Sequence, residues 1–154
     1  VAPCVINMNY YMDSRQLQLQ IEGVIDKRSG STFGPPAGKR VLYFVDDLNL
    51  PYIETYGTQN SLSLLRQLMD HGFFYDRTDL GFRMDVVDVQ FVSAMNPTAG
   101  SFTVNERVQR HFSTLACIMP STSDLTRIYG SILNGHLMGF AQSAQALAVP
   151  IVDA

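Results

Sequence analysis

Two consecutive carboxylates follow a short apolar run in the segment VLYFVDDLNLP, residues 41–51. A run of this length is typical of a strand buried in a parallel sheet, and ligands bind at the carboxyl ends of such strands. The pattern is that of a Walker B strand. In that motif the first acid, here Asp46, helps to hold the Mg²⁺ of a bound nucleotide, and the second, Asp47, orients or deprotonates the attacking water. The alternative is a buried strand whose aspartates only cap the following turn.

A matching phosphate-binding loop is not evident in the sequence. The segment GPPAGKR, residues 34–40, has only three residues between its first glycine and the Gly-Lys pair, and Arg40 replaces the hydroxyl residue of a Walker A loop. Pro35 and Pro36 have no N–H group to donate to a phosphate, and Lys39 leads into a strand instead of a helix. We therefore interpret the segment as a turn, so that a nucleotide site would be only half present.

Composition narrows the classes of partner. The chain has 154 residues, 46% of them hydrophobic and only 16% charged, which suits a chain that packs against neighbours. A net charge of −3 predicts neither nucleic acid nor an anionic membrane surface as a partner. Cys4 and Cys117 have neither metal-ligand spacing nor disulfide density, and the apolar stretches are too short to span a bilayer. We expect a cytoplasmic protein.

Strand and helix patterns alternate along the chain, which predicts an α/β fold. A helix from residue 61 has Leu62, Leu65 and Leu68 on one face, with Ser61 as its cap and Gly72 after its end. We expect further strands at 5–9, 41–46, 89–95 and 112–119, a hairpin formed by 73–75 and 82–84, helices at 14–26, 105–111 and 123–150, the first capped by Asp13 or Ser14, and a loop at 27–39.

Three polar elements follow one another along this pattern. The acid pair comes after one strand, Asn96 after the next, and Arg107 and Arg110 lie on a helix before a third. Alone, Asn96-Pro97 is typical of a turn, and an arginine on a polar helix is usually solvated. In ring-forming AAA+ ATPases the same order occurs as Walker B, sensor 1 and arginine finger. The joint order favours the functional interpretation, in which the finger stabilises transition-state charge on the nucleotide of an adjacent subunit.

The chain resembles an AAA+ module of a dynein heavy chain, most closely the third module of an axonemal one. The resemblance runs from about residue 5 to 137, and its most specific parts are FGPPAGKRVLYFVDDLNLP, YGTQNSLSLLRQLMDHGFFYDR, QFVSAMNPTAGSF, RVQRHFSTL and LTRIYGSIL. It implies that Asp46 belongs to the Mg²⁺ site, Asp47 is the catalytic carboxylate, and Asn96 is sensor 1. Arg110 is then the arginine finger, with Arg107 as the less favoured candidate.

The resemblance also implies an architecture. Residues 1–154 would form a single partial AAA+ large subdomain with a three-layer core and a parallel sheet. The Walker A strand, loop and helix would lie upstream of Val1, and the small lid subdomain would follow the C-terminus. With that strand missing from the middle of the sheet, the isolated chain would expose backbone and apolar surface and self-associate.

The implied function is part of an ATP-driven microtubule motor of the ciliary or flagellar axoneme. ATP or ADP with Mg²⁺ would bind the complete module, whereas the isolated chain would bind no cofactor and be inactive. Partners would be the adjacent AAA+ modules of the same heavy chain, and, through other regions, intermediate chains, light chains and microtubules. Two alternatives stay open: a regulatory or structural module without useful turnover, or another AAA+ ATPase. Asp47 stands where many AAA+ proteins carry Glu, one methylene longer, and a water misplaced by about an ångström can lower the rate roughly a hundredfold.

Overall fold

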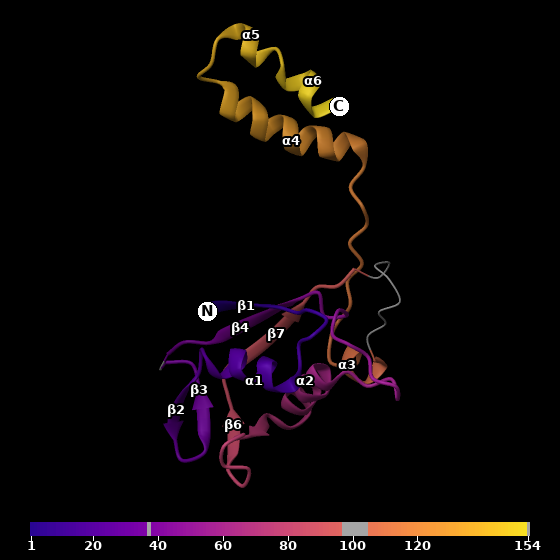
Figure 1. The fold of residues 1–154 in the computed structure, drawn as a ribbon. Coiled ribbons are helices and arrows are strands. Elements are labelled where there is room, and N and C mark those ends of the chain that lie inside the picture. The colour runs from indigo at the N-terminus through magenta and orange to yellow at the C-terminus, as the bar shows by residue number, and fades with distance from the viewer. Residues whose placement is uncertain (37, 97–104, 154) are drawn as a thin grey trace. The chain divides into compact units, whose positions relative to one another are not determined.

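The computed structural model describes residues 1–36, 38–96 and 105–153. These residues belong to two units, 1–114 and 115–154 (Figure 1). The prediction of a single subdomain over 1–154 stays a prediction. The predicted site residues that the structure describes all lie in the first unit.

A parallel sheet forms the centre of the first unit. Its strands are β1 (Ala2–Asn7), β4 (Val41–Asp46) and β7 (Val89–Ser93), in the order β1-β4-β7. In the central strand β4, alternate residues are fully buried and the residues between them are half-buried, so one face meets the core more closely than the other. Asn7 pairs with Asp46 and Val45 with Ser93, so the carboxyl ends of all three strands share one edge. The predicted α/β class with a parallel sheet is confirmed.

Two helices pack together beside this sheet (Figure 1). Helix α1 (Ser14–Glu22) begins with a capping box in which Asp13 and Gln16 exchange hydrogen bonds, so Asp13 is the cap. The helix ends four residues before the predicted end, because Gly23 caps it and Asp26 begins a strand. The hydroxyl of Tyr43 donates to the carbonyl of Ile21 at 2.8 Å, which joins α1 to β4.

Helix α2 (Asn60–His71) buries the predicted leucine face and ends at Gly72, which has φ 74° as a left-handed cap requires. The prediction that Ser61 caps this helix is wrong. The cap position is Gln59, which makes no capping hydrogen bond because its side chain is used elsewhere. Ser61 lies in the first turn with its hydroxyl buried and without a hydrogen-bond partner among the described residues.

The predicted loop at 27–39 is wrong in part, because some of these residues form strands of a second sheet. Strands β2 (Asp26–Ser29) and β3 (Thr32–Gly34) form a hairpin around Gly30, which has φ 55°. β3 pairs in parallel with β6 (Arg83–Val86), and β6 pairs with β5 (Phe73–Tyr75) as the predicted hairpin. The polar composition of 27–32 gave no strand pattern, and the partner of β3 lies about fifty residues further along the chain. Tertiary pairing therefore overrode local preference.

The region before the second unit departs further from the prediction. Helix α3 (Glu106–Gln109) is shorter than the predicted 105–111, with Asn105 and Arg110 at its two caps. The predicted strand at 112–119 is wrong, because these residues form no strand and most of them are exposed. A strand needs a hydrogen-bonded neighbour, and within the described residues this segment pairs with neither sheet.

In the second unit, the described residues 115–153 form three helices where one was expected at 123–150. Helix α4 (Thr122–Leu137) starts with a capping box of Ser121 and Asp124, and α5 (Gln142–Gln145) and α6 (Ala148–Asp153) follow. The break falls at Met138 and Gly139, consistent with the poor helix propensity of glycine. Pro150 is accommodated in the first turn of α6. No helix among the described residues has both the length and the apolar character to span a membrane.

Candidate functional site

The acid pair lies at the carboxyl end of the central strand. Asp46 is the last residue of β4 and is half-buried, and its carbonyl accepts a hydrogen bond from the N–H of Met8 at 3.0 Å. Its Oδ1 accepts the backbone N–H of Asp47 at 3.0 Å. This last contact is one that a turn cap would make. Because Oδ2 takes no part in it, Asp46 keeps a carboxylate oxygen that can face a cation.

Asp47 begins the turn after β4 in the left-handed region, with φ 53°. Aspartate adopts this conformation more readily than most residues other than glycine. The turn is closed by a backbone hydrogen bond from Leu50 to Asp47 at 2.9 Å, and the Asp47 side chain is exposed. Among the described residues the Asp47 carboxylate accepts no hydrogen bond, so the turn does not depend on it. Whether Asp47 is a catalytic carboxylate therefore stays a prediction.

Backbone hydrogen bonds join the loops that follow β4 and β7. Ala94 donates to the carbonyl of Val45 at 2.9 Å, and Leu48 donates to the carbonyl of Ala94 at 3.1 Å. Asn96 follows at the same edge of the sheet and is exposed. The structure thus brings Asp46, Asp47 and Asn96 to one edge, which we call the acid edge.

Asn49 is a residue of the acid edge that sequence reasoning did not assign. Its side chain is only 2% exposed, and its Nδ2 donates to the carbonyl of Asn96 at 3.2 Å. Its Oδ1 is buried without a partner among the described residues. The signal in the sequence was a lone amide between Leu48 and Leu50, directly after the acid pair. Asn49 therefore ties the turn after β4 to the loop that carries Asn96.

Gln59 supports the same turn from the other side. Its Nε2 donates to the carbonyl of Pro51 at 2.7 Å and lies 3.5 Å from that of Asn49, and the residue is buried. Gln59 also precedes α2. The loop after β4 is consequently fixed both to the neighbouring strand's loop and to the start of the helix.

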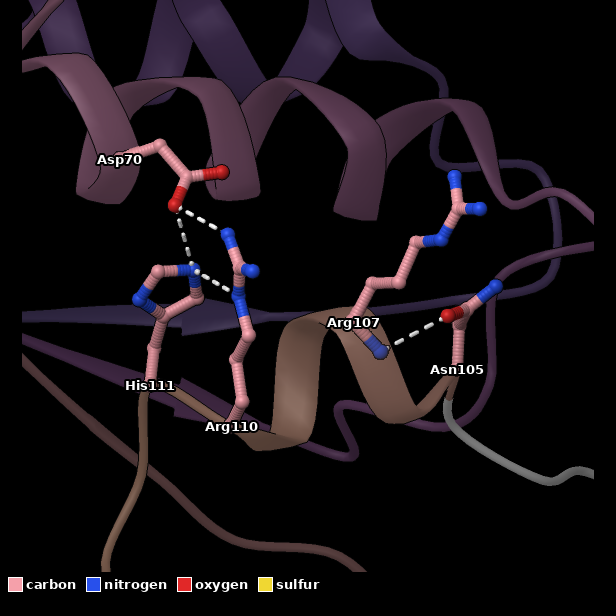
Figure 2. Close-up of polar contacts among 5 residues, drawn as sticks. All are labelled: Asp70, Asn105, Arg107, Arg110 and His111. Carbon is pink, nitrogen blue, oxygen red and sulfur yellow. Dashed lines mark hydrogen bonds and ion pairs between the residues drawn. The ribbon is translucent and has the colours of Figure 1, made fainter.

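Arg110 lies in a different place, at the end of α3 against α2. Its Nη2 forms an ion pair with Oδ1 of Asp70 at 2.5 Å, and Nε2 of His111 lies 3.1 Å from the same oxygen (Figure 2). Nε of Arg110 also lies 3.4 Å from Nε2 of His111. The imidazole nitrogen donates to Asp70 when it carries a proton and can accept from Arg110 when it does not. We call Asp70, Arg110 and His111 the Arg110 cluster.

The electrostatics of the Arg110 cluster centre on Asp70. Partial burial by itself raises the pKa of this carboxyl group, but the hydrogen bond and charge of Arg110, together with His111 and Arg66, outweigh that effect. The net result is a pKa below the ordinary value of 3.8. Asp70 is therefore ionised at neutral pH, and sequence reasoning did not identify it because it lies forty residues from Arg110.

Arg107 occupies the other end of α3. Its backbone N–H is held by Oδ1 of Asn105 at 2.9 Å, and its side chain extends away from the Arg110 cluster (Figure 2). With Arg66 and Gln59 it lines a cavity of about 60 Å³. A larger groove of about 650 Å³ lies along α2 and β5 and includes Asp70 but neither acid of the acid edge. The two candidate arginine fingers, Arg107 and Arg110, thus contact different residues.

The donor set at the acid edge suits magnesium better than a metal held by protein alone. Among the described residues, no three His, Cys, Asp or Glu side chains gather as a metal site. Mg²⁺ bound with a nucleotide usually takes one or two carboxylates, with phosphates and water as its other ligands. One half-buried and one exposed carboxylate at the end of a parallel strand fit that requirement.

The fold and the arrangement of this edge define the chain as a partial core of the AAA+ P-loop type. The family model described as "P-loop containing dynein motor region" matches residues 1–120, and the chain belongs to this dynein family.

The chain is similar to known heavy chains. It is 42% identical over 150 residues to dynein axonemal heavy chain 9 of Homo sapiens and 43% over 151 residues to the ciliary dynein beta chain of Tripneustes gratilla. It is 39% identical over 149 residues to the flagellar outer arm dynein beta chain of Chlamydomonas reinhardtii. These matches cover 96–97% of this chain but only 3% of each relative's length.

Proposed function

We propose that these residues are part of the third AAA+ module of an axonemal dynein heavy chain and contribute to an ATP-driven motor on microtubules. The names of the similar chains, which are axonemal, ciliary and flagellar dyneins, support this proposal and a location in the axoneme. Its partners are then the adjacent modules of the same heavy chain, with intermediate chains, light chains and microtubules bound through other regions. The observation that carries the proposal is the acid edge, where three polar residues converge on a sheet of the expected topology.

In the complete module, Asp46 holds Mg²⁺ through the carboxylate oxygen that its turn does not use. With nucleotide bound, the exposed Asp47 carboxylate would orient or deprotonate the attacking water, and Asn96 would serve as sensor 1. Bound Mg-ATP supplies the phosphoryl group that is transferred to water. No segment of residues 1–154 has the pattern of a Walker A loop. We therefore expect these residues alone neither to bind ATP tightly nor to hydrolyse it.

A second candidate function is a regulatory module that binds nucleotide without useful turnover. Asp47 favours it, since its carboxylate is one methylene shorter than the glutamate of many AAA+ enzymes and its backbone is fixed by a closed turn. A fixed turn leaves little freedom to move the carboxylate closer to the water.

Arg110 is the proposed finger for the nucleotide of an adjacent module. Its side chain is 59% exposed and is held against α2, and its polar contacts go to Asp70 and His111 instead of the acid edge. A cation so placed is suited to act across an interface. Where the neighbour hydrolyses ATP, such a finger accelerates hydrolysis roughly 10³- to 10⁵-fold.

The test uses a chimaeric heavy chain in which residues 1–154 replace the aligned segment of the Tripneustes gratilla beta chain. Arg110→Ala should slow single-turnover hydrolysis in the adjacent module by roughly 10³-fold or more while leaving the nucleotide affinity of its own module nearly unchanged. Arg107→Ala is the matched control and should have a smaller effect. If Arg110→Ala affects neither module, or only its own, the assignment of the finger is wrong.

A further inference from the structure

The guanidinium of Arg110 is held along one edge only. Asp70 is on the last turn of α2, with its side chain 18% exposed, and it contacts Nη2 of Arg110, while His111 lies beside Nε. A guanidinium presents several N–H donors in a rigid planar fork. The Arg110 side chain is 59% exposed, and the contacts drawn in Figure 2 engage Nε and Nη2, so the other terminal nitrogen is available to a further acceptor.

The carboxylate does not cancel the positive charge around it. The groups that act on Asp70 are Arg110, His111 and Arg66, and Arg107 shares a small cavity with Arg66. The guanidinium groups of Arg66, Arg107 and Arg110 thus outnumber the two carboxylates of Asp70 and of Glu106, which lies in the first turn of α3. Guanidinium groups bind phosphate oxygens well, so arginines gathered in this way suit an anionic partner.

We propose that Asp70 is a positioning residue for Arg110. It fixes the direction of a long side chain so that the exposed part of the guanidinium is ready to meet the nucleotide of an adjacent module. This inference rests on the proposed role of Arg110. A free arginine on a short helix would sample many rotamers, whereas an ion pair to a half-buried carboxylate on the neighbouring helix restricts it before the phosphate arrives.

The experiment compares Asp70→Asn, Arg110→Ala and the double variant in the chimaeric heavy chain. We expect Asp70→Asn to lower the single-turnover rate of the adjacent module by about tenfold, since misplacing a catalytic group by an ångström lowers rates by up to roughly a hundredfold. The apparent affinity of that module for ATP should stay within about twofold, because the effect is on the transition state. In the double variant Asp70→Asn should add no further loss, since it acts only through Arg110.

Asp88→Asn is the matched control. Asp88 forms an ion pair at the same 2.5 Å with Arg28 of β2, and asparagine tolerates its left-handed backbone, φ 57°. This variant should leave the adjacent module's rate unchanged. Asp70→Glu, which keeps the charge, should recover most of the rate lost in Asp70→Asn.

The outcomes separate the two proposals. If Arg110→Ala slows the neighbour and Asp70→Asn does not, Asp70 has no positioning role. A faster rate in Asp70→Asn would mean that Asp70 restrains Arg110, which also overturns the inference. A further loss in the double variant would point to a general structural effect of Asp70. If Arg110→Ala itself is without effect, the finger assignment fails first.

Discussion

The acid edge and the Arg110 cluster are positioned by different kinds of contact. At the acid edge, backbone hydrogen bonds and the buried amide of Asn49 fix the turns that carry the side chains. In the Arg110 cluster, the short helix α3 brings Arg110 close to α2, and an ion pair with Asp70 then fixes the position of its side chain. Backbone contacts in a core are little affected by salt or pH, whereas a partly exposed ion pair depends on both. The two regions should therefore respond differently to the same perturbation.

The largest difference between the two regions in nucleotide affinity should come from removing a carboxylate of the acid edge. In the chimaeric heavy chain, Asp46→Asn should weaken Mg²⁺-dependent nucleotide binding by its own module roughly a hundredfold, because it removes a metal ligand at a position fixed by the sheet. Arg110→Ala should leave that affinity nearly unchanged. Nucleotide titrations with and without Mg²⁺ measure both effects, with Asp88→Asn as the control. Equal affinities for Asp46→Asn and Asp88→Asn would show that the aspartate only caps the turn.

A smaller effect is expected at Asn49. Asn49→Ala removes a buried hydrogen bond between the two loops and should lower the free energy of unfolding by about 1–3 kcal/mol. Asn7→Ala is the matched control, since Asn7 lies at the same edge of the sheet but is exposed. Urea unfolding of both variants measures the difference. Similar values for the two would mean that the loops are held by their backbone bonds alone.

The smallest effect should be the acid titration of the Arg110 cluster. Because the pKa of Asp70 is lower in the folded chain, its carboxylate stabilises the fold fully above pH 3.8, and this contribution is lost as the pH falls through the folded-state pKa. An NMR titration of the Asp70 carboxyl carbon should give a pKa below 3.8, and Arg110→Ala should raise it. A pKa that is unchanged in Arg110→Ala would show that Arg110 is not its main partner. Asp76, whose pKa is lowered by hydrogen bonds from Thr78 and Asp79, should titrate alike in both chains.

The sequence by itself determined the features that depend on neighbours in the chain. The spacing of apolar residues predicted the buried face of α2, and Gly72 marked the end of that helix. For α1 the sequence left Asp13 and Ser14 as candidate caps, and the structure selects Asp13. The strand that ends at Asp46 and the turn that begins at Asp47 could be predicted for the same reason, since an apolar run and its turn are local. Parallel strands then had to bring Asn96 to the same edge.

Only the tertiary structure decided what depends on partners far along the chain. β3 became a strand because β6 was available to pair with it, while the more apolar segment 112–119 found no partner among the described strands. The contact between Asn49 and the loop of Asn96 joins residues 47 apart, and the ion pair of Asp70 with Arg110 joins residues 40 apart. Residue type sets what a side chain can bind. Which group it meets at that distance is set by the packing of the sheet and helices between them.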